Sequence, residues 1–163
     1  MAENLEELVA RITEEAIRAA QTAEAPERLT AADYPLLEKH PELVRTPTGK
    51  PADAITMEGV RDGSVVKEDL RISKEMLLAQ ADVAESAGKR QVAENLRRAA
   101  EMTAVPDDKV IEMYDKLRPH RSTKTELRAM AAALETQYGA PRLAKLVYEA
   151  VEIYEKRGIL LPE

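Results

Sequence analysis

Apolar residues recur at spacings of three and four near the start of the chain, with charged residues between them. Leu5, Leu8, Val9 and Ile12 define one apolar stripe, and Glu and Arg fill the other positions. This pattern predicts an amphipathic helix over residues 1–20. A single helix of this length is only marginally stable in water, so we expect its apolar stripe to dock on another surface.

The next two segments lack helical periodicity. Residues 21–32 are polar and rich in Ala, which predicts a flexible linker. Residues 33–72 contain seven helix-breaking residues, namely Pro35, Pro41, Pro47, Gly49, Pro51, Gly59 and Gly63. We expect an extended Pro/Gly-rich arm with short turns, of which TPTGKP (46–51) is the clearest. Such an arm needs a surface to lie on, either the chain's own helices or a second chain.

Residues 73–163 read as a helical body. Helical apolar periodicity returns at Ser73, a candidate N-cap, and continues to the end of the chain. Breaks are predicted at Gly88, before Pro106, at Arg118-Pro119, at Gly139 and at Gly158. Thr123 and Glu126 match a capping box. We expect an all-α fold, with a compact body of about four helices, the extended arm and the separate N-terminal helix.

Composition narrows the class of protein. The 163 residues suit one domain with an appendage, and they include no Phe, Trp or Cys, so the core must be aliphatic. The net charge of −6 argues against nucleic-acid binding. The absence of Cys excludes disulfides and thiolate metal sites. No apolar run could cross a membrane, and the acidic N-terminus lacks a signal core, so we expect a cytoplasmic protein.

Few residues suggest chemistry. His40 and His120 are the only two histidines, and neither has a second His at ligand spacing. We therefore assign no catalytic, cofactor-binding or metal-binding residues. TPTGKP lacks the glycines of a phosphate-binding loop, and Asp107 and Asp108 fit the start of a helix better than a metal site. A hydrolase or lyase based on His120 remains an alternative, but it needs a nucleophile and a carboxylate that the sequence cannot place.

Two clusters instead fit contacts with a partner protein. Arginine is favoured at protein interfaces because it pairs with two acceptors at once. The predicted interface residues lie in the arm and in the basic loop before Thr123, and they are Tyr34, Pro35, His40, Pro41, Arg118, His120 and Arg121.

Several sequence blocks resemble one enzyme family. They are DYPL (33–36), KHPELV (39–44), TPTGKP (46–51), EDLRIS (68–73) and AENLRRAAEMTAVPDDKVIEMYDKLRPHRSTKTEL (93–127). In this order they are similar to the small (gamma) subunit of adenosylcobalamin-dependent diol and glycerol dehydratases. The resemblance extends from about Asp33 to Lys156, around three-quarters of the chain.

The resemblance implies a lyase that converts a 1,2-diol into an aldehyde and water by a radical mechanism. In that family the holoenzyme is a dimer of heterotrimers. A large barrel subunit holds substrate and metal, and a medium subunit helps to bind the cobalamin. We expect this chain to be a non-catalytic structural subunit that packs against the large one and is inactive alone.

The N-terminal extension resembles those of diol dehydratases housed in bacterial microcompartments. We therefore expect residues 1–20, through Leu5, Leu8, Val9 and Ile12, to act as an encapsulation or assembly tag that binds a shell protein. TPTGKP instead resembles the glycerol-type relatives, so the choice between propane-1,2-diol and glycerol stays open. The alternative function is a stand-alone helical adaptor or another microcompartment-associated interaction protein.

Overall fold

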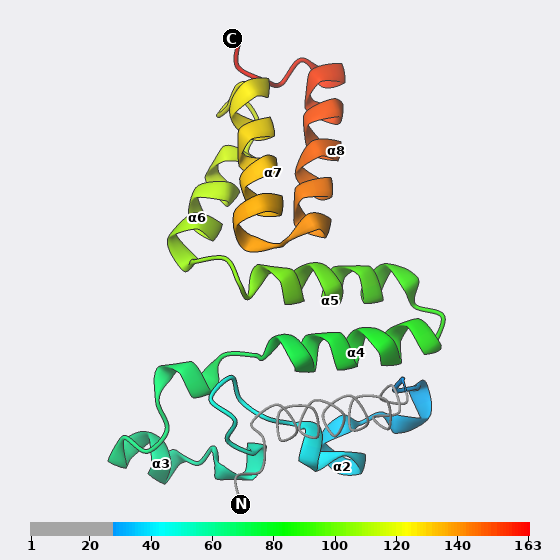
Figure 1. Ribbon diagram of the computed structural model, residues 1–163, viewed down its shortest axis with the longest axis vertical. Helices are drawn as coiled ribbons and strands as arrows, with labels where there is room; N and C mark the ends of the chain where they lie inside the picture. Colours follow the sequence, from blue (N-terminus) through cyan, green and yellow to red (C-terminus); the bar gives the residue numbers. More distant parts are fainter. Residues whose placement is uncertain (1–27) are drawn as a thin grey trace, which may run out of the picture.

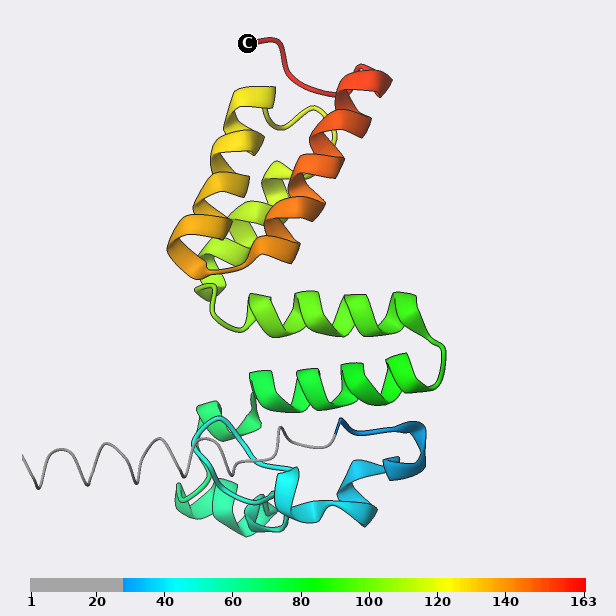
Figure 2. The same cartoon turned by 45° about the vertical axis from the view of Figure 1, so that its right-hand side comes forward.

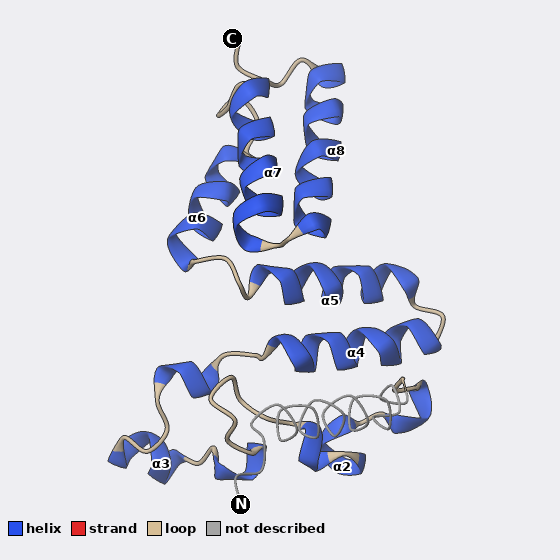
Figure 3. Ribbon diagram, in the orientation of Figure 1, coloured by secondary structure: helices blue, strands red, loops and turns tan. Residues whose placement is uncertain are grey.

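The computed structural model describes residues 28–163, so the predicted helix 1–20 and most of the predicted linker 21–32 lie outside the described residues. Within residues 28–163 every regular element is a helix, as Figure 3 shows, and an isolated bridge between Arg45 and Pro51 is the one strand-like feature. The prediction of an all-α fold is confirmed for this part of the chain.

The predicted arm consists of six short helical pieces joined by turns. They are η1 (Ala31–Asp33), α2 (Leu36–Lys39), η2 (Pro41–Leu43), η3 (Ala52–Ala54), α3 (Met57–Asp62) and η4 (Lys67–Leu70). The sequence pattern does not predict α3, because six residues with an internal glycine give no clear periodicity. Gly59 is nevertheless required there, since a Cβ atom would lie 2.7 Å from the Val65 side chain.

The arm packs on the chain's own helix α4 (Lys74–Ser86), which decides between the two surfaces considered from the sequence. Leu36 of the arm is buried against Met76 and Val83 of α4. At the other end of α4, the Ala31 backbone N–H donates to Ser86 Oγ at 3.2 Å. The predicted boundary between linker and arm at residues 32/33 falls inside η1, where the Thr30 side chain caps the turn.

Five helices follow the arm, one more than the approximate number predicted. They are α4, α5 (Arg90–Met102), α6 (Asp107–Lys116), α7 (Lys124–Tyr138) and α8 (Pro141–Arg157). The predicted N-cap at Ser73 is confirmed, as are the left-handed glycines Gly139 and Gly158. Pro106 lies one position before the first helical residue, so it is the N-cap residue of α6.

The helices form two antiparallel hairpins stacked into an elongated molecule (Figures 1 and 2). Helices α4 and α5 make one hairpin, α7 and α8 make the other, and α6 lies alongside α7. The hairpins meet where Glu101 of α5 accepts hydrogen bonds from the backbone N–H groups of Arg142 (2.8 Å) and Leu143 (3.0 Å) at the start of α8. The arm and the C-terminus therefore occupy opposite ends of the molecule.

The core is divided among the layers. The largest buried cluster joins α6, α7 and α8 and is built mainly from Leu, Val and Ala. Between α4 and α5 the buried contact is made by the small residues Ala81, Ala84 and Ala93, which allow the two backbones to approach closely. A third cluster holds the arm on α4. Within residues 28–163, the aliphatic core expected from the composition is thus present as three separate clusters.

Candidate functional site

The predicted interface residues lie at opposite ends of the molecule. Tyr34, Pro35, His40 and Pro41 surround α2 in the arm, whereas the loop 118–121 connects α6 to α7 beside the C-terminus (Figure 1). The fold therefore does not bring the two groups into one site. If both contact a partner, that partner must reach along the whole length of the molecule.

In the arm, His40 is held between two carboxylates. Its Nε2 atom lies 2.9 Å from Asp33 Oδ1, and its Nδ1 atom lies 3.3 Å from Glu42 Oε1. The hydrogen bond with Asp33, and secondly the one with Glu42, raises the pKa of His40 above its usual value. The pKa of Asp33 falls to about 2, mainly through the Thr30 backbone N–H and then through His40. Tyr34 beside this cluster remains 63% exposed.

The loop 118–121 has a fixed backbone and exposed side chains. His120 adopts φ +59°, an uncommon conformation outside glycine, and its backbone N–H donates to Ile159 O at 2.8 Å. Ser122, buried next to it, donates through Oγ to Lys116 O at 3.0 Å. Tyr154 Oη of α8 donates to Leu117 O at 2.5 Å. The C-terminal segment therefore holds the loop in a shape that presents Arg118, His120 and Arg121 to solvent.

The arrangement gives His120 no catalytic partner. Among residues 28–163, none of the side-chain hydrogen bonds or ion pairs joins the His120 ring to a carboxylate or a hydroxyl group. The neighbouring Arg118 pairs with Asp115 of α6 at 3.3 Å instead. A general base needs a substrate proton or nucleophile within reach and a group that orients its ring. The hydrolase alternative is therefore not favoured.

A buried carboxylate organises the TPTGKP turn, and no sequence motif indicates it. The Asp69 side chain is fully buried, and Lys50 Nζ lies 2.6 Å from its Oδ2 atom. Thr48 Oγ1 also donates to Asp69, as does the Val66 backbone N–H at 2.8 Å. Lys50, then Thr48, then Val66 hold the pKa of Asp69 far below its usual range. This carboxylate is structural, because it fastens the turn to the segment before α4.

A groove lies where α4, α5 and α6 meet, and sequence analysis also missed it. It has a volume of about 930 Å³ and combines residues from η4, the start of α4, the end of α5 and the start of α6. Its lining is mostly aliphatic and comprises Pro47, Ile72, Leu77, Ala99, Met102, Val105, Val110 and Ile111, with the charged residues Glu68, Arg71, Lys74, Glu75 and Asp107 at its rim. Arg71 directly follows η4, and its ion pair with Asp107 joins the end of η4 to the start of α6.

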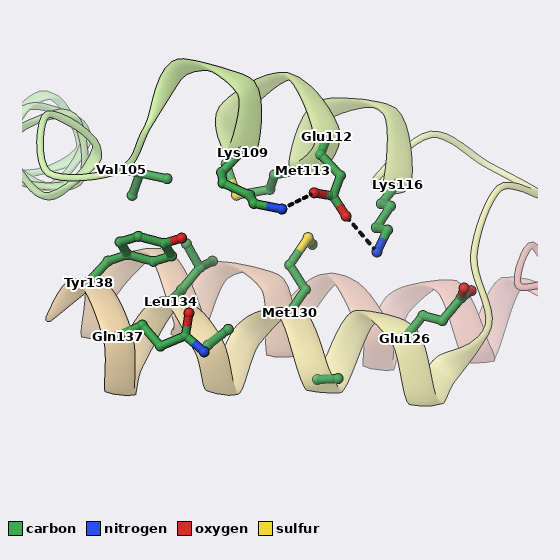
Figure 4. A pocket seen from close by; sticks show the side chains of 12 residues that line it. Val105, Lys109, Glu112, Met113, Lys116, Glu126, Met130, Leu134, Gln137 and Tyr138 are labelled. Carbon is green, nitrogen blue, oxygen red and sulfur yellow. Dashed lines mark hydrogen bonds and ion pairs between the residues drawn. The ribbon is translucent and has the colours of Figure 1, made fainter.

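A smaller pocket of about 270 Å³ lies between α6 and α7 (Figure 4). On the α6 side, Glu112 bridges Lys109 and Lys116, with N–O distances of 2.8 and 3.0 Å. Lys109 and then Lys116 lower the pKa of Glu112 to about 2. Met130 and Tyr138 line the pocket from the α7 side. Glu126 also lines the pocket, so two lysines and two glutamates balance, and the pocket offers neither a general acid near neutral pH nor an uncompensated anion site.

The ionisable groups with shifted pKa values share one property. Each shift arises mainly from an ion pair or a hydrogen bond within the fold, as with Arg97 of α5, whose pKa is raised by Glu85 of α4 and then by Glu94 of its own helix. Across residues 28–163 no group of three or more His, Cys, Asp or Glu could hold a metal ion. Within the same range, no helix is long and apolar enough to span a bilayer.

The comparisons with known proteins all match this chain to dehydratase small subunits. The family model described as "Dehydratase small subunit" matches residues 29–161. The chain is 50% identical over 125 residues to the propanediol dehydratase small subunit of Citrobacter freundii, covering 77% of this chain and 73% of that protein. It is 49% identical over 126 residues to the propanediol dehydratase small subunit of Salmonella typhimurium, with the same coverage.

Proposed function

The chain belongs to the dehydratase small-subunit family and is the small subunit of a diol dehydratase, and we propose that within this lyase it supplies structure and not catalysis. One observation carries the proposal. The residues matched by the family, 29–161, contain all eleven described helical elements, and their shifted ionisable groups serve to fasten those elements together. These ion-paired groups therefore serve the fold, and His120, which is not one of them, has no carboxylate or hydroxyl partner within residues 28–163 that could make it a general base.

Among residues 28–163, neither histidine is placed to bind the cobalt of a cobalamin. An imidazole that binds cobalt needs a free ring nitrogen directed at a cavity, and both ring nitrogens of His40 face carboxylates. His120 lies on an exposed loop and lines neither the groove nor the pocket described above. Adenosylcobalamin, which supplies the radical chemistry of these enzymes, is therefore assigned to the other subunits, and no step is assigned to residues of this chain.

The substrate is proposed from the names of the relatives, and the assembly is proposed from the family resemblance. Both relatives are named propanediol dehydratase small subunits, so propane-1,2-diol is the proposed substrate of the holoenzyme, in preference to glycerol. The proposed partners are a large and a medium subunit, arranged as a dimer of heterotrimers. The elongated shape supports this role, because it offers a long surface relative to the small core.

Both predicted contact clusters are part of the proposal. The basic side chains Arg118, His120 and Arg121 sit on a loop whose backbone is held by hydrogen bonds, so little backbone entropy is lost when they pair with acceptors on a partner. In the arm, His40 is held by Asp33 and Glu42, and Leu36 anchors the neighbouring α2 on α4. We assign both clusters to the polar margin of the contact between this chain and the large subunit.

Residues 1–20 lie outside the described residues, and their role as an encapsulation tag inside a bacterial microcompartment is proposed from their apolar stripe of Leu5, Leu8, Val9 and Ile12. Deleting residues 1–20 should leave dehydratase activity intact and abolish co-sedimentation of the enzyme with purified shells. Co-sedimentation that survives the deletion would refute the tag.

The non-catalytic role is tested by replacing both histidines in the complete enzyme. The double variant His40→Ala with His120→Ala should convert propane-1,2-diol to propanal, with added adenosylcobalamin, at a kcat within about twofold of the parent enzyme. A general acid or base typically contributes 10²-fold or more to the rate. A loss of that size in a complex of unchanged subunit composition would contradict the proposal.

A further inference from the structure

The start of α8 is capped by a side chain from another helix. Pro141 has no N–H group, and the N-cap residue Ala140 has no side chain that could accept a hydrogen bond. The first two N–H groups of α8, those of Arg142 and Leu143, both donate to Glu101 Oε2 on α5. The Glu101 side chain is only 11% exposed, and its negative charge faces the positive end of the α8 dipole. A carboxylate of one hairpin thus replaces the missing cap in the other.

Little else joins the two hairpins. Among residues 28–163, the hydrogen bonds that cross directly from the α4–α5 hairpin to the α7–α8 hairpin all end on Glu101. The Arg142 side chain adds ion pairs with Glu94 at 3.5 Å and with Glu101 at 3.6 Å, but it is half exposed, and exposed pairs contribute little. Met102 at the end of α5 packs against the largest buried cluster. The other buried contacts of the two hairpins lie within each of them.

A short linker connects the hairpins, and open space lies beside it. Residues 103–106 run from the end of α5 to the start of α6. Thr103 and Val105 of this linker line the groove of about 930 Å³ that lies where α4, α5 and α6 meet. The ion pair between Arg71 and Asp107 crosses from η4 to α6 there, but both side chains are half exposed or more. The joint between the hairpins is therefore not packed on all sides.

We propose that Glu101 is a latch that fixes the angle between the two hairpins, and that residues 103–106 are the hinge on which they turn when the latch opens. Each hairpin is stiffer than the joint, because Arg97 of α5 pairs with Glu85 of α4, and α7 and α8 share the largest buried cluster. When Glu101 moves away, water replaces it at the first N–H groups of α8. The groove then widens or narrows while each hairpin stays folded. The latch belongs to this chain alone, so it does not depend on the proposed function.

Pairs of spin labels test the latch directly, because the chain has no Cys and each label is attached at an introduced one. Gln91→Cys on α5 with Glu152→Cys on α8 reports a distance between the hairpins. Glu135→Cys on α7 with Glu152→Cys reports a distance within one hairpin, and all three positions are exposed. Double electron–electron resonance is recorded on the full chain. Glu101→Ala should broaden the distance distribution between the hairpins about twofold and leave the one within the hairpin unchanged.

The matched control is Glu94→Ala. It removes the other carboxylate that pairs with Arg142 but leaves the backbone cap of α8 in place. Its distribution between the hairpins should stay close to that of the parent chain. An unchanged width in Glu101→Ala would overturn the latch, and so would an equal effect of Glu94→Ala, which would assign the joint to the ion pairs. Equal broadening of both label pairs would show that Glu101 holds the whole fold and not the joint.

A second variant keeps the test decisive if Glu101→Ala loses helix content. Glu101→Gln keeps the length of the side chain and one oxygen acceptor but removes the charge that faces the α8 dipole. It should retain the far-UV circular dichroism of the parent chain and broaden the distribution between the hairpins less than Glu101→Ala does. A width equal to that of the parent chain would refute the latch, because the carboxylate charge would then contribute nothing to the joint.

Discussion

Asp69 shows how one side chain gives order to a segment with little regular structure. Its carboxylate accepts hydrogen bonds from Lys50, from Thr48 and from the Val66 backbone, so residues about twenty positions apart are fixed together. Because the side chain is fully buried, water cannot replace a lost partner. The turn TPTGKP thus owes its place in the structure to a residue that lies outside it.

Asp69→Asn should destabilise the protein, because the neutral amide leaves Lys50 without its counter-charge and cannot accept all three hydrogen bonds. We expect the midpoint of thermal unfolding to fall by about 4 °C or more, measured by circular dichroism at neutral pH. Asp53→Asn makes the same change at an exposed position on η3 and should leave the midpoint nearly unaltered. Equal midpoints for the two variants would contradict the structural role of Asp69.

The His40 cluster predicts a pH dependence in the arm. The pKa of His40 is raised, so protonated His40 stabilises the fold below about pH 6.5, and this contribution is lost as the pH rises through its folded pKa. Asp33 has a pKa of about 2 in the fold, so its carboxylate stabilises the arm above pH 3.8, the ordinary pKa of the group. This stabilisation is lost only as the pH falls from 3.8 toward 2. The cluster should therefore stabilise the arm most between about pH 4 and 6.5.

His40→Asn removes the titrating group and tests this dependence. The difference in unfolding free energy between the parent and the variant, measured by urea denaturation, should be larger at pH 6 than at pH 8.5. A difference that stays constant or grows toward alkaline pH would show that His40 is not protonated in the folded arm.

At the scale of single elements, local signals set the helix ends. The side chain of Thr123 accepts the Glu126 N–H at 3.2 Å, and Glu126 in return accepts the Thr123 N–H at 2.9 Å, which starts α7. Gly139 ends the same helix at φ +60°, a conformation that costs glycine little. These ends were predictable from the sequence because each depends on residues within one turn of the boundary.

Thr123→Ala should cost about 0.5–2 kcal/mol of unfolding free energy, because the Glu126 backbone N–H loses the hydroxyl that accepts it at the start of α7. Thr136→Ala is the matched control in the same helix. Its hydroxyl only bonds back to Ala132 O, and alanine favours a helix interior, so this variant should be neutral or slightly stabilising. Urea denaturation of both variants checks the prediction, and an equal effect at the two positions would exclude a specific cap.

Elements that depend on distant contacts were not predictable in this way. Helix α3 has only six residues, and its Gly59 is explained by the close approach of Val65, which no local pattern reveals. The arm was expected to need a supporting surface, but its docking on α4 through Leu36, Met76 and Val83 is a packing result. Periodicity identifies which residues are apolar, and three-dimensional packing decides what they meet.

At the scale of the whole molecule, the shape follows from how the core is divided. Three small clusters in place of one large core give an elongated chain of hairpins, with arm and C-terminus far apart. The interface residues predicted from the sequence are consequently split between the two ends. The groove was missed because it joins Ile72 to Ile111, and no motif links positions so far apart in the sequence. Such a shape, with exposed apolar residues along its side, suits a subunit that completes its burial against a larger partner.

Native mass spectrometry of the co-expressed enzyme tests the central claim most directly. The chain is produced together with the large and medium dehydratase subunits, and the complex is purified through a tag on the large subunit alone. The account predicts a particle with two copies of each subunit, and with this chain present in every complete assembly. A stable particle of large and medium subunits from which this chain is absent would contradict its role as the structural small subunit.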